Sequence, residues 1–510
     1  MSVKNPTVRI GMIQSAEEIR FSCNGSFRFV ALDGTVTGEG QAGEWYTISG
    51  VDAVAAEIRW GVRLAIAEQE QDALDALETT TARGIAATLW RQGLTLPLEG
   101  MVMDNREYWI VTGPFDDQSQ TREFVRTYEP VGEAVVVKEI LQPSHGTCRC
   151  GDLACSDGIR IVPHDEAGVI MLANVTVGIE FHWQHQATQT LPGVLEVRFN
   201  NQGRLLAINE LDIEEYLISV NSSEMTAENP MELLKAQTIA ARSTILATMG
   251  KHHYDEPFHL CADDHCQCYH GKGKVTDASV QATRETAGEN LIYGQRVCDA
   301  RYAKICGGVM EDYPYVWDNR PVPYLVAGVD GKADLSTSLR DEEHVKAYID
   351  SEPDVYCNTI KYEIPTRLPY NTRELFRWRV SYDREQVEAL IRKKLGDDFG
   401  ELVDLLPGER GNSGRLLWMD VVGSKKTVRV GKELAIRRIL SESHLYSACF
   451  YIERERDDAG QVSRFHLIGA GWGHGVGLCQ VGATVMAQLG FDYRRILQHY
   501  YKNSTLQKIY

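Results

Sequence analysis

A thirteen-residue stretch of the chain is rich in side chains that bind metals. Residues 259–271 read HLCADDHCQCYHG, with three cysteines and three histidines. Zinc binds cysteine thiolates and histidine imidazoles in tetrahedral sets, and Cys261, His265 and Cys266 follow the spacing C-x-x-x-H-C. A disulfide knot and a reactive thiol are the alternatives. For the fourth position the sequence leaves several candidates: His259, Cys268, His270 or a water molecule, with Cys306 as a more distant one.

A carboxyl group stands just before a predicted helix that carries two cations. Glu224 lies in SVNSSEM, and Lys235 and Arg242 follow it. The two cations are seven residues apart, which places them within about 20° of each other on a helix. A carboxyl at this position could act as a general acid and base on an anionic or polyhydroxyl substrate. A surface glutamate with solvated cations is the simpler alternative.

A glycine-rich segment surrounds one histidine. GAGWGHGVGLCQVGA, residues 469–483, holds six glycines around His474. Glycine permits tight turns and close approach of other groups, so we expect His474 to project from a loop just before a helix. No Lys-Ser or Lys-Thr follows, so this segment is not a phosphate loop.

The elements that must position these residues are strands followed by helices. Residues 7–55 and 134–210 alternate polar and apolar side chains, which predicts strands, whereas 57–98 changes to a helical period. CRCGDLACSDG lies between two of the predicted strands, and we interpret it as a turn with incidental thiols. In the helical block 211–250, we expect a helix with Asn229 as N-cap, Pro230 at N1 and Gly250 after its end.

The 510 residues are too many for one ordinary core. We predict a mixed α+β fold: a strand-rich core with a buried catalytic-site helix, C-terminal helices and a small α+β insertion. The expected boundaries are 1–56 for the first strands, 57–133 for the insertion and 134–510 for the catalytic domain. The insertion vaguely resembles the sporulation-related repeat, a peptidoglycan-binding module.

Bulk composition excludes some functions. The net charge of −18 argues against a duplex nucleic-acid binder. No stretch reaches the roughly 18 apolar residues of a membrane span. The N-terminal residues show no secretory signal, so we expect a cytoplasmic chain as written, or a cell-envelope protein if it is exported or its leader is missing.

The order of several motifs resembles the SpoIID/LytB family of sporulation lytic transglycosylases and amidase enhancers. The matching segments are NELDIEEYLISVNSSEM, LLKAQTIAARS, CADDHCQCYHG, ICGGV with a later VW, and GWGHGVGLCQVGA. The resemblance covers roughly residues 160–510, with the strands at 7–55 as a split start.

The resemblance implies a role for each motif. Glu224 would be the catalytic acid/base of a lytic transglycosylase that cleaves peptidoglycan glycan strands after N-acetylmuramic acid. The alternative is a wall-binding activator of a cell-wall amidase, without catalysis. Cys261, His265 and Cys266 would bind zinc, as a structural or cleft-lining ion. The implied substrate-binding residues are Lys235, Arg242, Gln267, Tyr269, His474 and Gln480.

Overall fold

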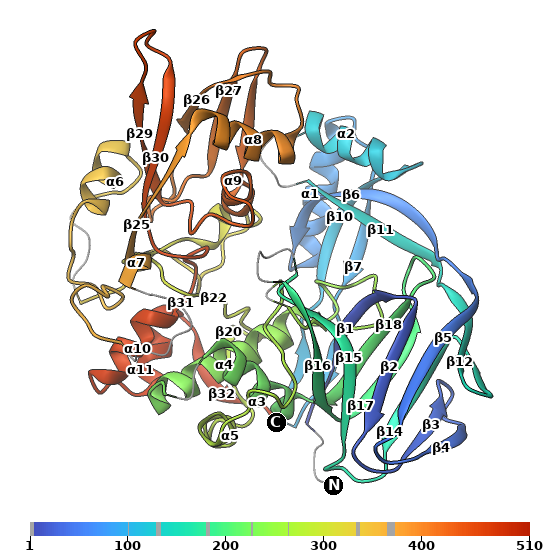
Figure 1. The fold of residues 1–510 in the computed structure, drawn as a ribbon. Helices are drawn as coiled ribbons and strands as arrows, with labels where there is room; N and C mark the ends of the chain where they lie inside the picture. The colour runs from blue at the N-terminus through green and yellow to red at the C-terminus, as the bar shows by residue number, and fades with distance from the viewer. Residues whose placement is uncertain are drawn as a thin grey trace.

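The computed structural model describes residues 5–99, 101–128, 134–179, 184–225, 228–263, 265–332, 337–364 and 373–510. It confirms the mixed α+β class, with several sheets beside a layer of helices (Figure 1). None of the helices in these ranges is long and apolar enough to cross a membrane.

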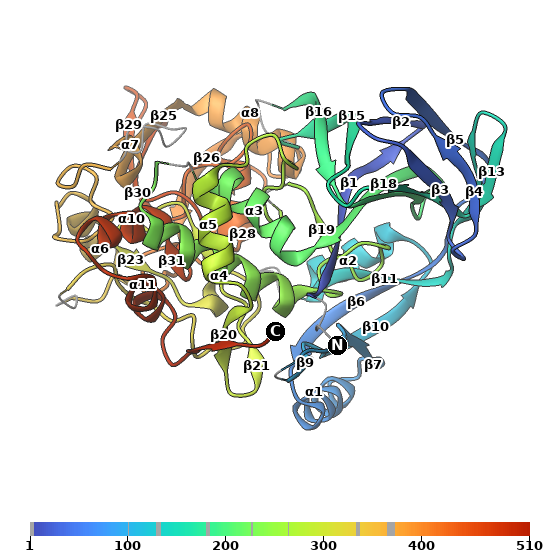
Figure 2. The same ribbon diagram turned by 90° about the horizontal axis from the view of Figure 1, so that it is seen from below.

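Two sheets pack against each other and share one hydrophobic core, to which β1, β2, β15 and β17 all contribute buried side chains (Figures 1 and 2). The first sheet has the order β19 (Leu260–Cys261), β1 (Thr7–Ala16), β18 (Leu205–Asp212), β17 (Val194–Phe199), β14 (Gly158–Pro163), β3 (Phe27–Ala31), β4 (Val36–Gly40). The second has the order β13 (Leu153–Ser156), β12 (His145–Cys150), β5 (Trp45–Val54), β2 (Glu18–Cys23), β15 (Val169–Val177), β16 (His185–Pro192).

The predicted turn in CRCGDLACSDG is the β12–β13 hairpin, in which Cys148 lies opposite Cys155. Both thiols are buried in the shared core. Burial raises the pKa of Cys148 to about 12, which keeps it protonated. These cysteines serve packing.

An inserted domain interrupts the double-sheet unit. We define it as residues 57–142, because its last strand ends beyond the predicted boundary at 133. Its sheet has the order β11 (Val135–Gln142), β6 (Glu57–Ala67), β10 (Glu107–Phe115), β7 (Ala87–Gln92), and its other elements are α1 (Glu70–Ala82), α2 (Gln118–Tyr128), β8 (Thr95–Pro97) and β9 (Val102–Asp104).

The helical period expected over 57–98 is confined to α1. Residues 57–67 instead form β6, which pairs with β10 on one side and β11 on the other. A strand paired on both sides satisfies all its backbone groups, and this tertiary pairing overrides the local pattern.

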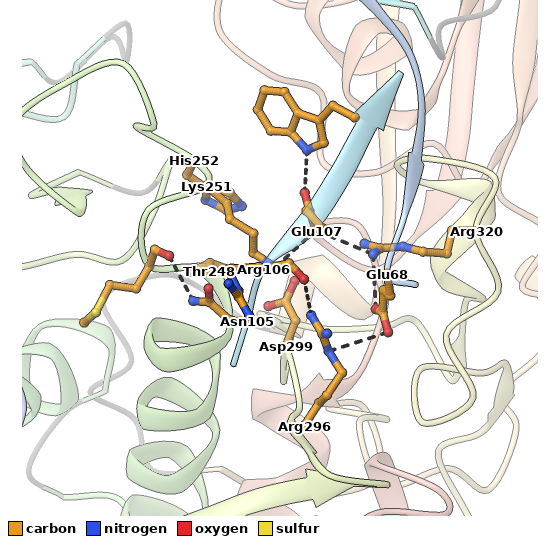
Figure 3. Close-up of polar contacts among 12 residues, drawn as sticks. Glu68, Asn105, Arg106, Glu107, Thr248, Lys251, His252, Arg296, Asp299 and Arg320 are labelled. Atoms are coloured by element: carbon orange, nitrogen blue, oxygen red, sulfur yellow. Dashed lines mark hydrogen bonds and ion pairs between the residues drawn. The ribbon is translucent and has the colours of Figure 1, made fainter. Parts of the chain in front are cut away.

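Asn105 anchors the inserted domain to the end of α4 (Met231–Thr248). Its side-chain amide donates to the carbonyl oxygen of Leu246 at 2.8 Å. It also donates to the carbonyl oxygen of Met249 at 2.9 Å (Figure 3). Carbonyl groups at a helix C-terminus lack partners within the helix. The Asn105 amide of the inserted domain supplies hydrogen-bond partners for two of these carbonyl groups.

Glu107 is the buried charge at the same junction. It accepts a hydrogen bond from Trp109 Nε1 at 2.8 Å and pairs with Lys251 at 3.2 Å and Arg320 at 3.6 Å (Figure 3). Burial alone would raise the pKa of Glu107, but these cations and the Trp109 bond outweigh it and lower the pKa. The inserted domain is therefore attached through paired charges.

The helical layer contains α4 at its centre, with almost every residue of this helix buried. Pro230 is the N-cap, one residue later than expected, and the Asn229 side chain instead accepts a bond from Thr484. Gly250 follows the helix with φ of 75°, as predicted. The neighbours of α4 are α3 (Ile213–Glu224), α5 (Asp277–Glu285), α10 (Gln480–Gln488), α11 (Tyr493–Tyr500), β20 (Glu289–Tyr293) and β21 (Arg296–Val297). The C-terminal strand β32 (Thr505–Lys508) pairs with β20.

The remaining region, 302–479, forms small sheets and helices above this layer in Figure 1. Its β22 (Tyr302–Ala303) pairs in parallel with β31 (Leu478–Cys479), so the region begins and ends side by side. Its other elements are β23 (Val309–Met310), η1 (Tyr313–Tyr315), β24 (Gly328–Val329), α6 (Glu342–Ile349), α7 (Arg373–Phe376), β25 (Arg377–Asp383), α8 (Arg384–Leu395), β26 (Leu402–Pro407), β27 (Trp418–Gly423), β28 (Thr427–Gly431), α9 (Glu433–Ile439), β29 (Phe450–Arg456) and β30 (Val462–Ala470).

Candidate active site and metal centre

Glu224 is the last residue of α3. Its Oε1 accepts a hydrogen bond from the Cys268 backbone N–H at 3.2 Å, and the side chain is half-buried. Its backbone carbonyl accepts a bond from Lys304 Nζ at 3.4 Å. The carboxylate thus meets one directed donor, and a cation lies beside it.

Polar contacts hold the C-terminal turn of α3 against its neighbours. The Asn221 side chain donates to the Leu234 carbonyl at 3.0 Å and also bonds Thr238 on α4. Ser222 Oγ donates to Ser279 Oγ on α5 at 2.7 Å. These bonds fix the turn from which Glu224 projects, so the position of its carboxylate is set by α4 and α5.

Lys304 and Tyr302 complete the surroundings of Glu224, and the sequence analysis missed both. Tyr302 begins β22 and Lys304 follows that strand, and the charge of Glu224 acts on both side chains. Burial lowers the pKa of Lys304, while the negative charges of Glu224 and Cys268 oppose that shift. The spacing Y-x-K was the available signal, but nothing local linked it to Glu224.

Arg242 does not reach a substrate position. Its side chain is 0% exposed and binds both carboxylate oxygens of Glu214 at 2.6 and 2.9 Å. It also donates to the Glu289 carbonyl, while the Tyr510 hydroxyl donates to Glu214. Arg242 therefore connects α4 to the start of α3 and to the C-terminus. We expected it to bind the glycan, but its buried side chain instead holds these elements in position.

Lys235 also pairs away from Glu224. Its ammonium lies 2.8 Å from Glu285 and 3.1 Å from Glu232. The pairs raise the pKa of Lys235 even though its partial burial acts in the opposite direction. It shares a helix with Arg242, as predicted, but contacts neighbouring carboxylates.

Gln267 and Tyr269 lie inside the protein. Gln267 is 1% exposed, donates to the Ala241 carbonyl and accepts from Tyr216. Tyr269 is fully buried, stacks on Tyr216 and donates to Asn209 at 2.6 Å. Both side chains face the core and not a substrate. They stabilise the loop whose Cys268 N–H bonds Glu224.

His474 is a neutral histidine beside Trp317, and the centroids of the two rings lie 4.9 Å apart. Burial, followed by the charges of Arg301, Arg415 and Arg437, lowers the pKa of His474 to about 3. Its Nδ1 accepts the Val476 N–H at 3.0 Å, so the proton of the neutral ring is on Nε2.

The glycines around His474 are required by close packing. A side chain at Gly477 would overlap the Arg301 carbonyl, and Gly477 has a φ of 73°. Gln480, the other residue predicted from this motif, is 3% exposed and bonds Gln237 on α4. The motif locks the start of α10 against α4 and against the strand that carries Tyr302.

Cys261, His265 and Cys266 come together as predicted, and His253 is the fourth member of the cluster. Cys266 Sγ lies 3.3 Å from His253 Nε2 and 3.6 Å from His265 Nδ1, and Cys261 Sγ lies 3.9 Å from His265 Nδ1. A tetrahedral zinc with bonds of about 2.3 Å to sulfur and 2.0 Å to nitrogen separates sulfur from nitrogen by about 3.5 Å. The four side chains therefore fit a tetrahedral metal ion.

The protonation of the cluster favours a ligand role. Hydrogen bonding from Cys266 outweighs burial and lowers the pKa of Cys261, with further help from His253 and His265. The same contact raises the pKa of Cys266. A thiolate is the form of cysteine that binds metals.

The candidates proposed for the fourth position lie elsewhere. The His259 ring accepts the Arg9 N–H, Cys268 faces Glu224 through its backbone, and the His270 N–H bonds Ser219. Cys306 belongs to a different cluster, described below. His253 was missed because it is eight residues before Cys261, outside the motif, in the turn that follows α4.

Comparison with known proteins places this site in a family. The model for the stage II sporulation protein family, SpoIID, matches residues 201–293, which include Glu224 and all four members of the Cys/His cluster. Stage II sporulation protein D of Bacillus amyloliquefaciens is 25% identical over 58% of this chain and 74% of its own length. This chain belongs to the SpoIID/LytB family.

Two further relatives show the spread of the family. An uncharacterized protein of Brachyspira hyodysenteriae is 30% identical over 58% of this chain and 67% of its own length. The amidase enhancer of Bacillus subtilis is 25% identical over 57% of this chain, which spans only 40% of that protein. Residues 311–477 match a separate domain of unknown function, DUF8618, so this SpoIID/LytB member carries a distinct region between its core motifs.

Proposed function

We propose that this SpoIID/LytB protein acts on the cell wall as a peptidoglycan lytic transglycosylase, with Glu224 as general acid and base. The observation that carries the proposal is the Glu224 carboxylate at the end of α3, which accepts the Cys268 N–H and lies beside Lys304. One carboxyl suffices for a transglycosylase, whereas a glycoside hydrolase usually needs two.

The reaction balances with one proton donor. Glu224 protonates the glycosidic oxygen after N-acetylmuramic acid as the bond from that oxygen to C1 breaks. The resulting carboxylate then takes the proton of the muramyl C6 hydroxyl, whose oxygen bonds C1 and closes the 1,6-anhydro ring. The Cys268 N–H orients the carboxylate, and the Lys304 ammonium stabilises its charged form.

We propose zinc for the cluster of His253, Cys261, His265 and Cys266. Two thiols and two imidazoles suit zinc, and four protein ligands leave no position for a reacting water. A structural ion agrees with the placement of Cys266, which is two residues before Cys268. Holding Cys266 would hold the N–H that bonds Glu224.

The second candidate is a wall-binding activator of a cell-wall amidase, without catalysis. The similarity to the amidase enhancer of Bacillus subtilis favours it. Either function requires the chain to meet peptidoglycan, by export to the cell envelope or through internal wall fragments.

Digestion of purified, peptide-free glycan strands tests the proposal. The wild-type protein should release 1,6-anhydromuramyl products, detected by mass spectrometry, and Glu224→Gln should reduce them by about 10²–10⁴-fold. Glu215→Gln, an exposed change on the same helix, is the matched control and should keep activity. Intact strands with folded wild-type protein would exclude catalysis, and equal stimulation of an added amidase by wild type and Glu224→Gln would support the activator.

A further inference from the structure

A second group of metal-binding side chains lies apart from the Cys/His cluster. Cys306, Asp330, Cys357 and Cys479 place one sulfur or oxygen atom each within 4.8 Å of one another. Each residue is at most 2% exposed. They come from four separate segments: the loop after β22, the residue after β24, the loop after α6, and the N-cap of α10.

The distances suit a tetrahedral ion. Cys306 Sγ lies 3.6 Å from Cys357 Sγ and 3.5 Å from Asp330 Oδ2. Bonds of about 2.3 Å to sulfur and 2.0–2.2 Å to oxygen place tetrahedral neighbours about 3.8 Å apart for two sulfurs and about 3.5 Å for sulfur and oxygen. Both distances from Cys306 therefore match tetrahedral coordination of zinc, and all four ligand atoms lie within 4.8 Å of one another.

The surroundings of the cluster resemble the outer shell of a metal site. Cys479 Sγ accepts the backbone N–H groups of Cys306, at 3.2 Å, and Gly482, at 3.4 Å. Asp330 accepts the Cys357 N–H at 3.1 Å on the oxygen that faces Cys306. Such bonds orient ligands and stabilise their charged forms.

The other oxygen of Asp330 faces Tyr500 and His499. The Tyr500 hydroxyl donates to Oδ1 at 2.7 Å, and His499 Nε2 lies 3.6 Å from the same atom. A fully buried carboxylate among three thiols has a high desolvation cost unless a cation compensates it. A side chain at Gly482 would overlap the carboxylate, so α10 closes the space against water.

We propose that Cys306, Asp330, Cys357 and Cys479 form a second, structural metal site that takes zinc or a similar thiophilic divalent ion. Three thiols select a soft or borderline metal, and four protein ligands complete its coordination. The site lies outside the segment that matches the SpoIID model, and two of its ligands belong to the DUF8618 region. It would join two segments of that region to the loop after β22 and to the N-cap of α10.

Metal analysis of the purified full-length chain tests the site. Elemental mass spectrometry should find two zinc ions per chain in the wild type. Cys357→Ser and Cys261→Ser should each reduce the content to one, because they belong to different clusters. Cys298→Ser is the control, since Cys298 is equally buried but belongs to neither cluster, and it should retain two ions.

A second measurement covers the case in which Cys357→Ser does not fold. Wild-type protein is titrated with a mercurial thiol reagent, and the released metal is counted with a coloured chelator. We expect two metal ions to be released per wild-type chain. No metal released from folded Cys261→Ser, or a Cys306–Cys357 disulfide in non-reducing peptide mapping, would overturn the second site.

Discussion

At the scale of single residues, the proposed chemistry depends on the contact between Glu224 and the segment that carries Tyr302 and Lys304. Lys304 is the one of the two that carries a charge, so its protonation should control activity at high pH.

Lys304 gives a pH prediction with a definite sign. Burial lowers its pKa below the ordinary 10.5, so the ammonium loses its proton as pH rises through that lowered value. Activity should fall over the same window. Lys304→Arg keeps a positive charge to higher pH, since arginine has a pKa above about 12, and should extend the alkaline limit of the rate profile. An unchanged alkaline limit in a folded, active Lys304→Arg protein would show that Lys304 does not set it.

Arg242 gives a stability prediction. Arg242→Met leaves the carboxylate of Glu214 in a mostly buried position without its bidentate partner, which should cost about 3–5 kcal/mol of unfolding free energy. Denaturant unfolding measures the loss. The double variant Arg242→Met with Glu214→Leu should recover part of it, whereas additive losses would mean that the pair is not the cause.

At the scale of elements, local signals predicted some segments better than others. Gly250 follows α4 as expected, because helix-end signals depend on neighbouring residues. β6 was missed because its strand state depends on pairing with β10 and β11, which are distant in sequence. Elements with strong end signals were predictable, and those defined by their partners were not.

The residues of the candidate site also divide into those predictable from local sequence and those defined by distant partners. Cys261, His265 and Cys266 form a compact motif, so their association was predictable. His253 and Lys304 reach the site through turns and strand pairing that no spacing reveals. The ligand set of the second cluster is spread from residue 306 to residue 479, which only the fold brings together. Residue type and local spacing therefore predicted the chemistry of the site. Its supporting residues could be identified only from the structure.

The loop from 253 to 268 should act as one unit through its metal cluster. His253→Ala should lower the metal content and increase hydrogen exchange of the amide groups around Cys268. Misplacing the N–H that bonds Glu224 could reduce turnover by about 10²-fold. His259→Ala is the control, because its ring contacts Arg9 instead of the cluster. Equal effects of both variants would remove His253 from the ligand set.

At the scale of the whole molecule, the inserted domain is attached through the paired charge of Glu107. The folded-state pKa of Glu107 is lowered, so its stabilising contribution is present above the unfolded value of about 4.3 and is lost as pH falls through the folded value. A cavity of about 380 Å³ lies between the inserted domain and residues 254–255. These residues directly follow His253, so this part of the junction borders the loop that carries the metal cluster.

Glu107→Gln should loosen this junction without changing Glu224. We expect a loss of about 2 kcal/mol, because Lys251 and Arg320 lose a buried charged partner. Limited proteolysis at neutral pH should cleave residues 57–142 faster in the variant, and the difference from wild type should shrink at acid pH. Glu139→Gln on β11 is the control, because Glu139 is partly exposed and pairs only with Arg59 among the salt bridges of the described residues. Equal cleavage of Glu107→Gln and wild type would contradict this account of the junction.

The most direct test of the central claim is digestion of peptide-free glycan strands in water enriched in heavy oxygen. A transglycosylase with Glu224 as its only acid and base closes the ring with the substrate's own C6 oxygen. We predict anhydro products without heavy oxygen, absent in Glu224→Gln. Reducing-end products that carry heavy oxygen would show hydrolysis, and unlabelled anhydro products that persist in Glu224→Gln would show that another residue performs the chemistry.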